Sequence, residues 1–415
     1  MRSTILIAAA LARIVAGAPA PAPEDLSFLD LGAILDAPAP DAVGPPQTAV
    51  ASVTTTFFID TASLAASISA DVTAAATASI TGAAASAAST QTPALKRRQA
   101  TSTSSSDAPC PTTPEAGTYC GFINPEDSCA PQPAGYGPLV TPDTPEDFKS
   151  YPLFKQLSLG AQTPKGYSNV FKNLNASTTA NSYITYKVLT SYNVSDCAAF
   201  CDSYSLCTAF NVFIERDPSI NPSTGGDNAD IGGWGSECPN PSSITNYKCS
   251  LWGSNIDAVS ATNTGEARDS FQVVITGSNG YDKTNTTTPA KCPGWTPPTK
   301  CSGGAISKGG SYLVGSNFYP GPFDPSVCAI YAQAQTNKNK QVAISKGLKS
   351  YTPCNMFNSY MINKNGIPQG TYCALYNTVL TPSWASFLSA LLGEILFSVK
   401  GSWTYSLTNQ LTGKC

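Results

Sequence analysis

The sequence predicts an α+β protein made of two small modules, each with one helix packed on an antiparallel sheet, behind a disordered propeptide. Three observations predict this class. All 14 cysteines lie after residue 98, short runs of β-branched and aromatic residues accompany a helical segment, and one series of motifs occurs twice in the same order. The cysteines indicate that disulfides staple each module.

Residues 1–17 are expected to be a secretory signal peptide. Arg2 precedes a short apolar run that ends at Ala12, and small residues follow as far as Ala18. This order of basic, apolar and small residues is typical of exported chains, and the run is too short to span a bilayer of ~30 Å. We therefore expect a secreted protein of the extracellular space or cell wall, without a membrane span.

Residues 18–98 have the composition of a disordered propeptide. Ala, Ser, Thr and Pro dominate, and such a segment buries too little apolar surface to offset the entropy of ordering it. It ends in Lys96, Arg97 and Arg98, which resemble the dibasic site of kexin-type processing proteases. Cleavage there starts the mature chain at Gln99. Residues 99–182 then form a Cys-containing head and a Pro/Gly-rich segment, of which 130–180 is expected to run over the surface of the first module.

An even number of cysteines in an exported chain predicts a disulfide framework. A zinc ribbon needs paired C-x2-C clusters, and the sequence has none. Three Asn-x-Ser/Thr sequons follow the processing site and are the expected glycosylation sites: Asn175, Asn193 and Asn285.

The chain contains no histidine, which excludes Ser-His-Asp and Cys-His catalysis and histidine-ligated metals. It has no phosphate-binding loop and no dinucleotide motif, so no cofactor and no metal site are expected. A net charge of −3 without a Lys/Arg stripe argues against a nucleic-acid partner. A pair of carboxylates of the glycosidase type remains possible, with the candidates Glu215, Asp217, Glu266 and Asp269. For Glu215-Arg216-Asp217, a turn at a strand end with surface ion pairs is the simpler interpretation.

An internal repeat organises the mature chain. The pattern C-x-x-F-N-x-aromatic-aliphatic occurs at 207–214 and again at 354–361. Cys249-x-Leu251-Trp252 then matches Cys373-x-Leu375-Tyr376, and the same offset continues to the pairs Gly277/Gly401, Ser278/Ser402 and Tyr281/Tyr405. Such a series in one order indicates two diverged copies of one module.

The first copy predicts a helix and three strands. Ser195-Asp196 stands where an N-cap belongs, and Cys197 and Cys201 follow at i and i+4, on one face of the expected helix. The strands are expected at 209–214, 248–252 and 271–276. The 15-residue apolar stretch 385–399 is expected to be core of the second copy.

These residues resemble the PAN/apple module, whose pattern is a helix with C-x3-C, a Cys that opens a strand, and a later C-x-Leu/aromatic strand. The resemblance covers 183–292 well and 301–415 loosely, with a linker at 293–300, and it extends to fungal (ascomycete) secreted proteins that join two such modules. It implies the pairs Cys197–Cys249, Cys201–Cys207 and Cys328–Cys373.

The second copy departs from the pattern, because Ala332 stands where the second helix Cys is expected. Cys354 therefore lacks the partner that the pattern gives it. A Cys301–Cys415 bridge that closes the ends of the module is the favoured arrangement. Cys354 is then free, or joined to Cys110, Cys120, Cys129, Cys238 or Cys292.

The resemblance implies a non-catalytic recognition or adhesion protein that binds a glycan or an extracellular protein. The alternatives are a secreted glycoside hydrolase with paired carboxylates and a structural cell-wall protein. Charge divides the copies: 183–301 holds 7 Lys/Arg against 11 Asp/Glu, and 302–415 holds 8 against 2. Trp252 and Tyr376 were weighed as sugar platforms, with core packing the favoured role for both.

Overall fold

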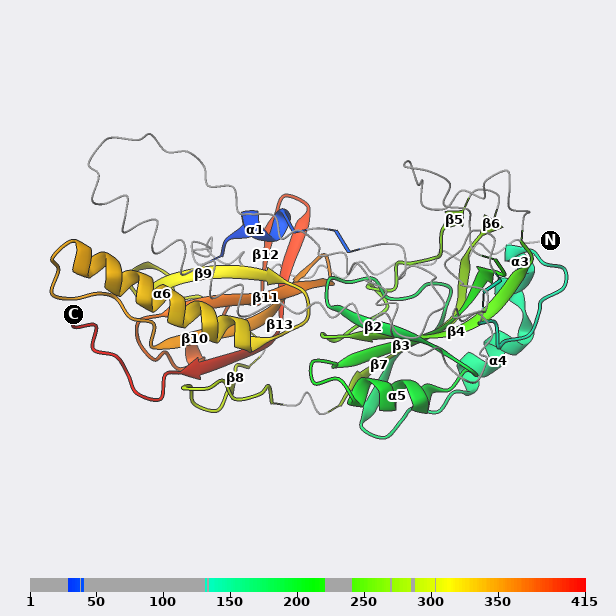
Figure 1. Ribbon diagram of the computed structural model, residues 1–415, viewed down its shortest axis with the longest axis horizontal. Coiled ribbons are helices and arrows are strands. Elements are labelled where there is room, and N and C mark those ends of the chain that lie inside the picture. Colours follow the sequence, from blue (N-terminus) through cyan, green and yellow to red (C-terminus); the bar gives the residue numbers. More distant parts are fainter. Residues whose placement is uncertain are drawn as a thin grey trace, which may run out of the picture.

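The computed structural model describes residues 29–37, 39–40, 131–132, 134–220, 241–268, 271–284, 288–302 and 304–415. Helices and antiparallel sheets make up these parts, so the predicted α+β class is confirmed. Figure 1 shows the two large sheets beside one another. The predicted signal peptide, the processing site at 96–98 and the cysteines Cys110, Cys120, Cys129 and Cys238 lie outside the described residues.

The first sheet has five strands in the order β1-β7-β3-β4-β2, and all neighbours are antiparallel. Their bounds are β1 Tyr167–Leu174, β2 Tyr183–Leu189, β3 Ala209–Pro218, β4 Ser243–Trp252 and β7 Val274–Lys283. A separate pair, β5 (Ala267–Arg268) and β6 (Phe271–Gln272), lies beside it. The strands predicted at 209–214 and 248–252 are present and longer than expected, whereas 271–276 is divided between β6 and β7.

Helix α5 (Val194–Asp202) is tied to this sheet by two disulfides. Cys197 is bonded to Cys249 of β4 and Cys201 to Cys207, with Cα–Cα distances of 5.7 and 5.4 Å. These are the pairs that the resemblance implied. The N-cap expected at Ser195-Asp196 is instead Asn193, whose side chain accepts the N–H groups of those two residues at 3.0 and 3.2 Å.

Residues 130–180 contribute to the core, so the expectation that they run over the surface is wrong. They contain α3 (Pro145–Ser150), α4 (Pro152–Gly160) and β1. Phe148 and Phe154 are buried in the first core, and their ring centroids are 4.8 Å apart. Because β1 pairs with β7, the segment also supplies one edge of the sheet.

The second sheet has the order β12-β13-β10-β11-β9, with β8 also paired to β13. Its strands are β8 Thr299–Lys300, β9 Leu313–Pro320, β10 Met356–Lys364, β11 Ile367–Tyr376, β12 Ser389–Leu392 and β13 Ile395–Ser406. Helix α6 (Pro325–Ser345) lies between β9 and β10 in sequence, and short 3-10 helices cover Gly310–Tyr312 and Pro382–Trp384. The expected linker 293–300 thus supplies β8, and Trp295 is buried in the second core.

The cysteines of the second sheet are only partly paired. Cys328 of α6 is bonded to Cys373 of β11, as the resemblance implied, with a Cα–Cα distance of 5.3 Å. The favoured Cys301–Cys415 bridge is wrong: both are free, with Cys301 buried and Cys415 exposed. Their backbones are held at different places, because the Cys301 N–H donates to Ser402 and the Cys415 N–H to Lys349. Cys292 and Cys354 are also free and buried.

The asparagine of the repeated motif has equivalent hydrogen bonds in both sheets. The Nδ2 atoms of Asn211 and Asn358 each donate to a serine Oγ and to the next carbonyl, all at 2.9 Å. The acceptors are Ser278 and Asn279 in the first sheet and Ser402 and Trp403 in the second. Each Oδ1 accepts a backbone N–H from outside the motif, from Thr178 at 2.9 Å or Ile306 at 2.8 Å.

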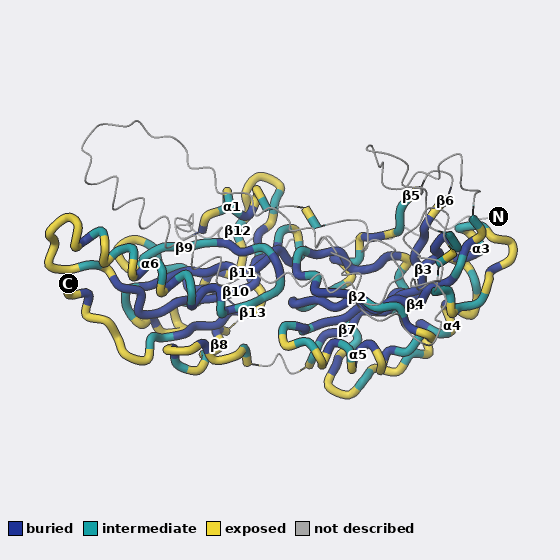
Figure 2. Tube along the Cα trace, in the orientation of Figure 1, coloured by how far each residue is buried: buried dark blue, intermediate teal, exposed yellow. Residues whose placement is uncertain are grey.

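The aromatic residues of the motif are also packed alike. Phe210 stacks on Tyr281 with centroids 4.9 Å apart, and Phe357 stacks on Tyr405 at 4.6 Å. All four rings are fully buried. In the burial view of Figure 2, the central strands of both sheets are dark blue over most of their length.

The apolar stretch 385–399 is mostly not core, contrary to expectation. It forms the β12–β13 hairpin, in which Phe387 and Phe397 are buried. Leu388 and Leu391 are 60% and 67% exposed. Strand alternation accounts for β13, where Phe397 and Val399 are buried and Leu396, on the opposite face, is 42% exposed. On the edge strand β12, Leu391 and the next residue, Leu392, are both exposed.

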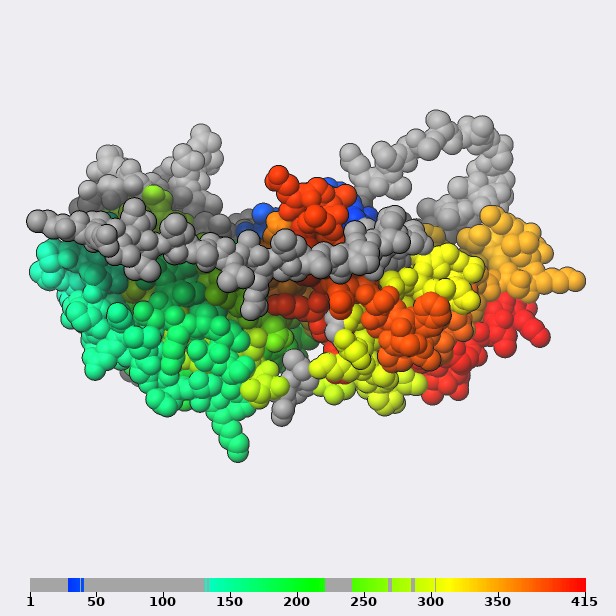
Figure 3. Space-filling view, turned by 180° about the vertical axis from the view of Figure 1, so that it is seen from behind, coloured from blue at the N-terminus to red at the C-terminus, as the bar shows by residue number. Residues whose placement is uncertain are grey.

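A short helix from the expected propeptide packs on the second sheet. Helix α1 (Leu31–Leu35) has Asp30 as its N-cap, and Leu29 and Ile34 are buried in a cluster with residues of β9, β10, β11 and β13. The expectation of a disordered segment is therefore wrong for 29–37. Figures 1 and 3 both place α1 beside the β12–β13 hairpin.

The two sheets contact each other through their loops. The Phe323 N–H donates to the Gly253 carbonyl at 2.8 Å, and Lys400 forms an ion pair with Asp257 at 3.2 Å. A Cβ atom on Gly253 would lie 2.3 Å from the Cβ of Pro322, so only glycine permits this approach. No helix in the described parts of the chain is both long enough and apolar enough to cross a bilayer.

Candidate functional site

Glu215 and Asp217 share one face of β3, where β4 brings Lys248 between them. The side chains of the three residues are 7%, 2% and 6% exposed, in that order. The interpretation as a turn with surface ion pairs is therefore wrong: both carboxylates lie inside a ten-residue strand paired along its length to β4. Arg216 points to the opposite face and pairs with Asp143 at 2.8 Å.

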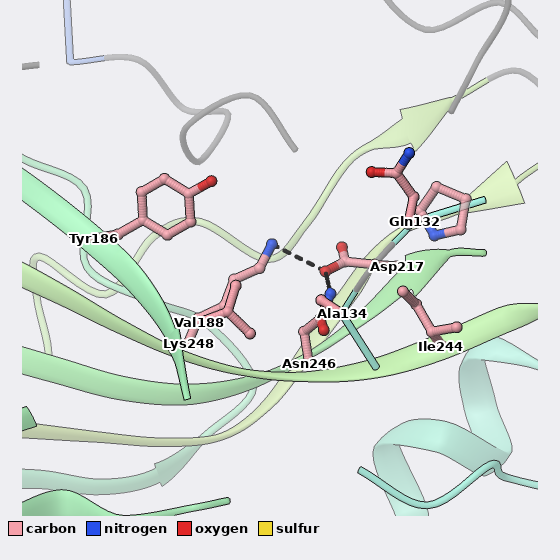
Figure 4. A pocket seen from close by; sticks show the side chains of 9 residues that line it. Gln132, Ala134, Tyr186, Val188, Asp217, Ile244, Asn246 and Lys248 are labelled. Atoms are coloured by element: carbon pink, nitrogen blue, oxygen red, sulfur yellow. Dashed lines mark hydrogen bonds and ion pairs between the residues drawn. The ribbon is translucent and has the colours of Figure 1, made fainter. Parts of the chain in front are cut away.

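One ammonium group serves both carboxylates. Lys248 Nζ contacts Glu215 Oε1 and lies 3.0 Å from Asp217 Oδ2. Asn246 Nδ2 donates to the same Asp217 oxygen at 2.6 Å. Figure 4 shows the Lys248 side chain directed at Asp217, with the ring of Tyr186 from β2 on the far side of the ammonium group.

The charges of this cluster shift its pKa values in opposite directions. Burial and the adjacent Asp217 carboxylate raise the pKa of Glu215 to about 8. The pKa of Asp217 stays low: although burial opposes it, the Lys248 charge and the hydrogen bonds from Glu215, Asn246 and Lys248 outweigh that effect. The two carboxylates likewise raise the pKa of Lys248 against the opposing effect of burial. A single cation neutralises a single anion here, so the second carboxyl group binds a proton.

The space around the cluster is too small for a sugar. Its cavity has a volume of about 20 Å³ and is lined by Gln132, Ala134, Tyr186, Val188, Asp217, Pro218, Ile244, Asn246 and Lys248. A cavity of this size holds about one water molecule. A glycosidase needs a cleft that places the glycosidic oxygen between its two carboxyl groups. Glu215 and Asp217 are instead a closed ion cluster.

The other carboxylates considered lie elsewhere. Glu266 precedes β5, and Asp269 lies outside the described residues. Asp324 is the N-cap of α6, and Glu394 is exposed in the turn between β12 and β13. The three described residues among these, Glu266, Asp324 and Glu394, do not line the Lys248 cavity.

The second sheet has different residues at the positions of the ion cluster. Strand pairing aligns Phe213 with Lys248 in the first sheet and Tyr360 with Tyr372 in the second. With the repeat in register, Tyr372 therefore stands at the position of Lys248 and Ile362 at that of Glu215. The positions of Lys248 and Glu215 are thus apolar in the second copy, whereas Lys364 stands at that of Asp217.

The aromatic residues weighed as sugar platforms are buried. Trp252 is 4% exposed and packs edge-on against Tyr183, and Tyr376 is fully buried with its hydroxyl donating to the Ile306 carbonyl. Both rings therefore pack in the core, which was the favoured role.

An exposed aromatic pair was missed by the sequence analysis. Tyr312 and Trp384 are 40% and 45% exposed, and Lys308 Nζ lies 5.1 Å and 4.3 Å from their ring centroids. Rings with an open face and a nearby cation can contact a sugar or a peptide side chain. No motif spacing links Trp384 to Tyr312, because tertiary folding brings them together.

The glycosylation candidates differ in their setting. Asn175 is exposed, with its Oδ1 accepting from Thr276 at 3.0 Å. Asn193 is partly exposed and caps α5 through Oδ1, which leaves Nδ2 for a glycan. Asn285 lies outside the described residues.

Among the described residues, no three His, Cys, Asp or Glu side chains are grouped so that they could hold a metal ion. Comparison with family models, curated proteins and solved structures finds no significant match to this chain.

Proposed function

We propose that this protein is a secreted, non-catalytic recognition or adhesion protein that binds glycans or extracellular proteins through two copies of an apple-like helix-on-sheet module. One observation carries the proposal. The two sheets keep the same interior hydrogen bonds of Asn211 and Asn358, while the same outer position is ionic in one copy and apolar in the other. The retained hydrogen bonds support two related modules, and the divergence of buried residues beside them supports a separate role for each module.

The hydrolase alternative has less support. Its best carboxylate pair, Glu215 and Asp217, is neutralised by Lys248 beside a cavity of about 20 Å³. For the binding function, the exposed rings of Tyr312 and Trp384 offer a contact surface with the Lys308 ammonium between them. A glycan stacked on Trp384 gains apolar contact with the ring face and hydrogen bonds from the lysine.

An array of fungal and host glycans, probed with the secreted protein, tests this function. We expect retention of specific glycans, and a loss of at least tenfold in apparent affinity, about 1.4 kcal/mol, for Trp384→Ala. Leu348→Ala is the matched control, because Leu348 is also exposed, at 54%, and carries no ring.

Two outcomes would decide against the proposal. Release of shortened glycans that is abolished in Glu215→Gln would establish the hydrolase. Absence of binding to every glycan and to extracellular protein extracts would favour the structural wall protein.

A further inference from the structure

The face of the second sheet that points away from α6 is strongly apolar, and we call it the outer face. Six of its residues form one buried cluster: Phe318, Tyr360, Ile362, Tyr372, Phe397 and Val399. The residues that pack under α6 belong to a different cluster, which contains Phe357, Cys373 and Leu375. The outer face is therefore a second core of the sheet, and it needs its own cover.

Residues 29–37 supply part of that cover, beside Ala305 and Phe387 of the same cluster. Leu29 and Ile34 are 8% and 0% exposed within the cluster, and the Asp30 N–H donates to the Tyr372 hydroxyl oxygen. Leu35, next to Ile34, is 36% exposed and lies on the other side of α1. The segment thus binds through a small set of side chains, with Ile34 as the central one.

Residues 29–37 lie on the outer face as a bound peptide would. Every strand of the second sheet comes from residues 299–406, whereas 29–37 belongs to the N-terminal region ahead of the predicted processing site. A five-residue helix is not stable on its own, so α1 depends on the face for its structure. Residues 29–37 carry Asp30 and Asp36 and no basic residue, whereas 302–415 as a whole holds 8 Lys/Arg against 2 Asp/Glu, so the net charge of the second half attracts an acidic segment.

The first sheet has a comparable arrangement with different chemistry. Its corresponding face carries Lys248, Glu215 and Asp217, and Gln132 and Ala134 line the cavity beside them. The Gly137 N–H donates to the Thr245 carbonyl at 3.0 Å, which fixes this segment on β4. In both halves, a segment that precedes the strands lies on the outer face, and the residues beneath it have diverged.

We propose that the outer face of the second sheet is a peptide-binding site, that residues 29–37 fill it in the intact chain, and that it accepts in their absence a short apolar peptide with an acidic residue before one helical turn. The inference goes beyond the proposed function, because it assigns a second surface and a second class of ligand. The glycan array neither supports nor overturns it.

The covalent link explains why the intact chain keeps its own segment. A tethered segment has an effective concentration of about millimolar, so a free peptide of equal intrinsic affinity competes poorly at micromolar concentration. Weakening the tethered segment alone should therefore open the site to added peptide.

A fluorescein-labelled synthetic peptide of residues 27–40 is the probe, and its anisotropy is measured with the full chain in which Lys96, Arg97 and Arg98 are replaced by Ser, so that residues 29–37 stay attached. We expect Ile34→Asp in the chain to bind the probe saturably and at least tenfold more tightly than the unaltered chain. Ile34→Ala should lie between the two. Leu35→Asp is the matched control and should behave as the unaltered chain, because Leu35 is exposed. A probe that itself carries Ile34→Asp should not bind any of them.

Disulfide mapping of Cys328–Cys373 shows that each variant is folded. Folded Ile34→Asp and Ile34→Ala chains that bind the probe no better than the unaltered chain would overturn the proposal. Such a result would mean that residues 29–37 do not occupy the site in the unaltered chain.

Discussion

A single ammonium group holds two buried carboxylates together in the first sheet. Counted over the whole residue, backbone included, Lys248 is 5% exposed, and its neighbours Glu215 and Asp217 are 6% and 2% exposed. Buried charges of this kind are tolerated only when they are paired and hydrogen-bonded, as Asn246 and Lys248 pair Asp217 here. We infer that the cluster favours one packing arrangement of β3 and β4 and adds little net stability.

Lys248→Met should lower the free energy of unfolding by about 3–5 kcal/mol, because it leaves the Asp217 carboxylate buried without a cation. Urea denaturation at pH 7 measures the change. The matched control is the triple variant Lys248→Tyr, Glu215→Ile and Asp217→Asn, which places Tyr and Ile as in the second sheet, removes both carboxylates together with the cation, and should recover most of the loss. A cost below about 1 kcal/mol for Lys248→Met would show that the cluster is not closed.

Glu215 should make stability fall as the pH rises from 4.5 to 8. Its pKa in the folded protein is about 8, against an ordinary value of 4.5, so the folded state holds a proton that the unfolded chain releases. The stability it contributes is complete below pH 4.5 and is lost as the pH passes 8, with a slope of at most about 1.4 kcal/mol per pH unit. Asp217, whose pKa is lowered, acts only in the acid range.

Urea denaturation of the unaltered protein and of Glu215→Gln at pH 5, 6, 7 and 8 measures this effect. The difference between the two profiles isolates Glu215 from Asp282, whose pKa burial raises to about 6. Parallel profiles would contradict the prediction.

At the scale of helices and strands, both copies have a disulfide from the helix to a strand, and only the first copy has a second disulfide. Cys207 and Cys354 open equivalent strands, and the Sγ of each lies near the carbonyl two residues on, at 3.2 and 3.3 Å. Cys201 is bonded to Cys207, whereas Ala332, fully buried at the corresponding position of α6, lies in the same core cluster as Cys354 and offers it no thiol. The Cys354 N–H donates to Thr336 Oγ1 at 2.9 Å, one turn beyond Ala332.

Ala332→Cys should therefore form a new disulfide with Cys354 and leave secretion unchanged. Mass spectrometry of the non-reduced, digested protein detects the linked peptides. Ala343→Cys is the matched control, since Ala343 is equally buried on α6 but about three turns away. Absence of the new bridge would mean that the second copy no longer follows the module pattern.

Cys197→Ala should destabilise the first sheet by about 2–5 kcal/mol and reduce secretion, because it removes the bridge from α5 to β4. Cys328→Ala should do the same to the second sheet. Cys415→Ala, at an exposed and unbonded cysteine, is the control and should change neither quantity. Secreted yield and urea midpoints test the three variants together.

For the whole molecule, we propose that processing at Lys96-Arg97-Arg98 links the N-terminal region to function. Residues 29–37 cover the second sheet, and Lys96-Arg97-Arg98 separates them in sequence from both sheets. Cleavage at this site would turn the tethered cover into a free peptide, and the advantage of its high effective concentration would disappear.

The secreted protein should begin at or near Gln99, because the basic site closes a stretch of low apolar content. N-terminal sequencing of the secreted material gives the answer directly. Substitution of Lys96, Arg97 and Arg98 by Ser is the control and should leave a longer chain. A mature product that begins intact at residue 18 or 19 would contradict the prediction.

Local patterns were sufficient for the α+β class and for the strands at 209–214 and 248–252, because these depend on neighbouring residues. The cysteine pairs came from the family resemblance. The Asp30 N-cap before Leu31 was a local signal for α1 that the composition of 18–98 concealed.

Other features depend on contacts between distant segments. A carboxylate at 215 is an exposed turn or a buried ion according to whether β4 places Lys248 against it, and nothing within β3 decides this. The leucines at 388 and 391 are core or surface according to which side of the hairpin meets the sheet. Cys301 and Cys415 stay apart because their backbones pair with different strands and loops. The periodicity of a sequence indicates which side chains share one face of a strand. Whether that face is buried depends on which other segments pack against it.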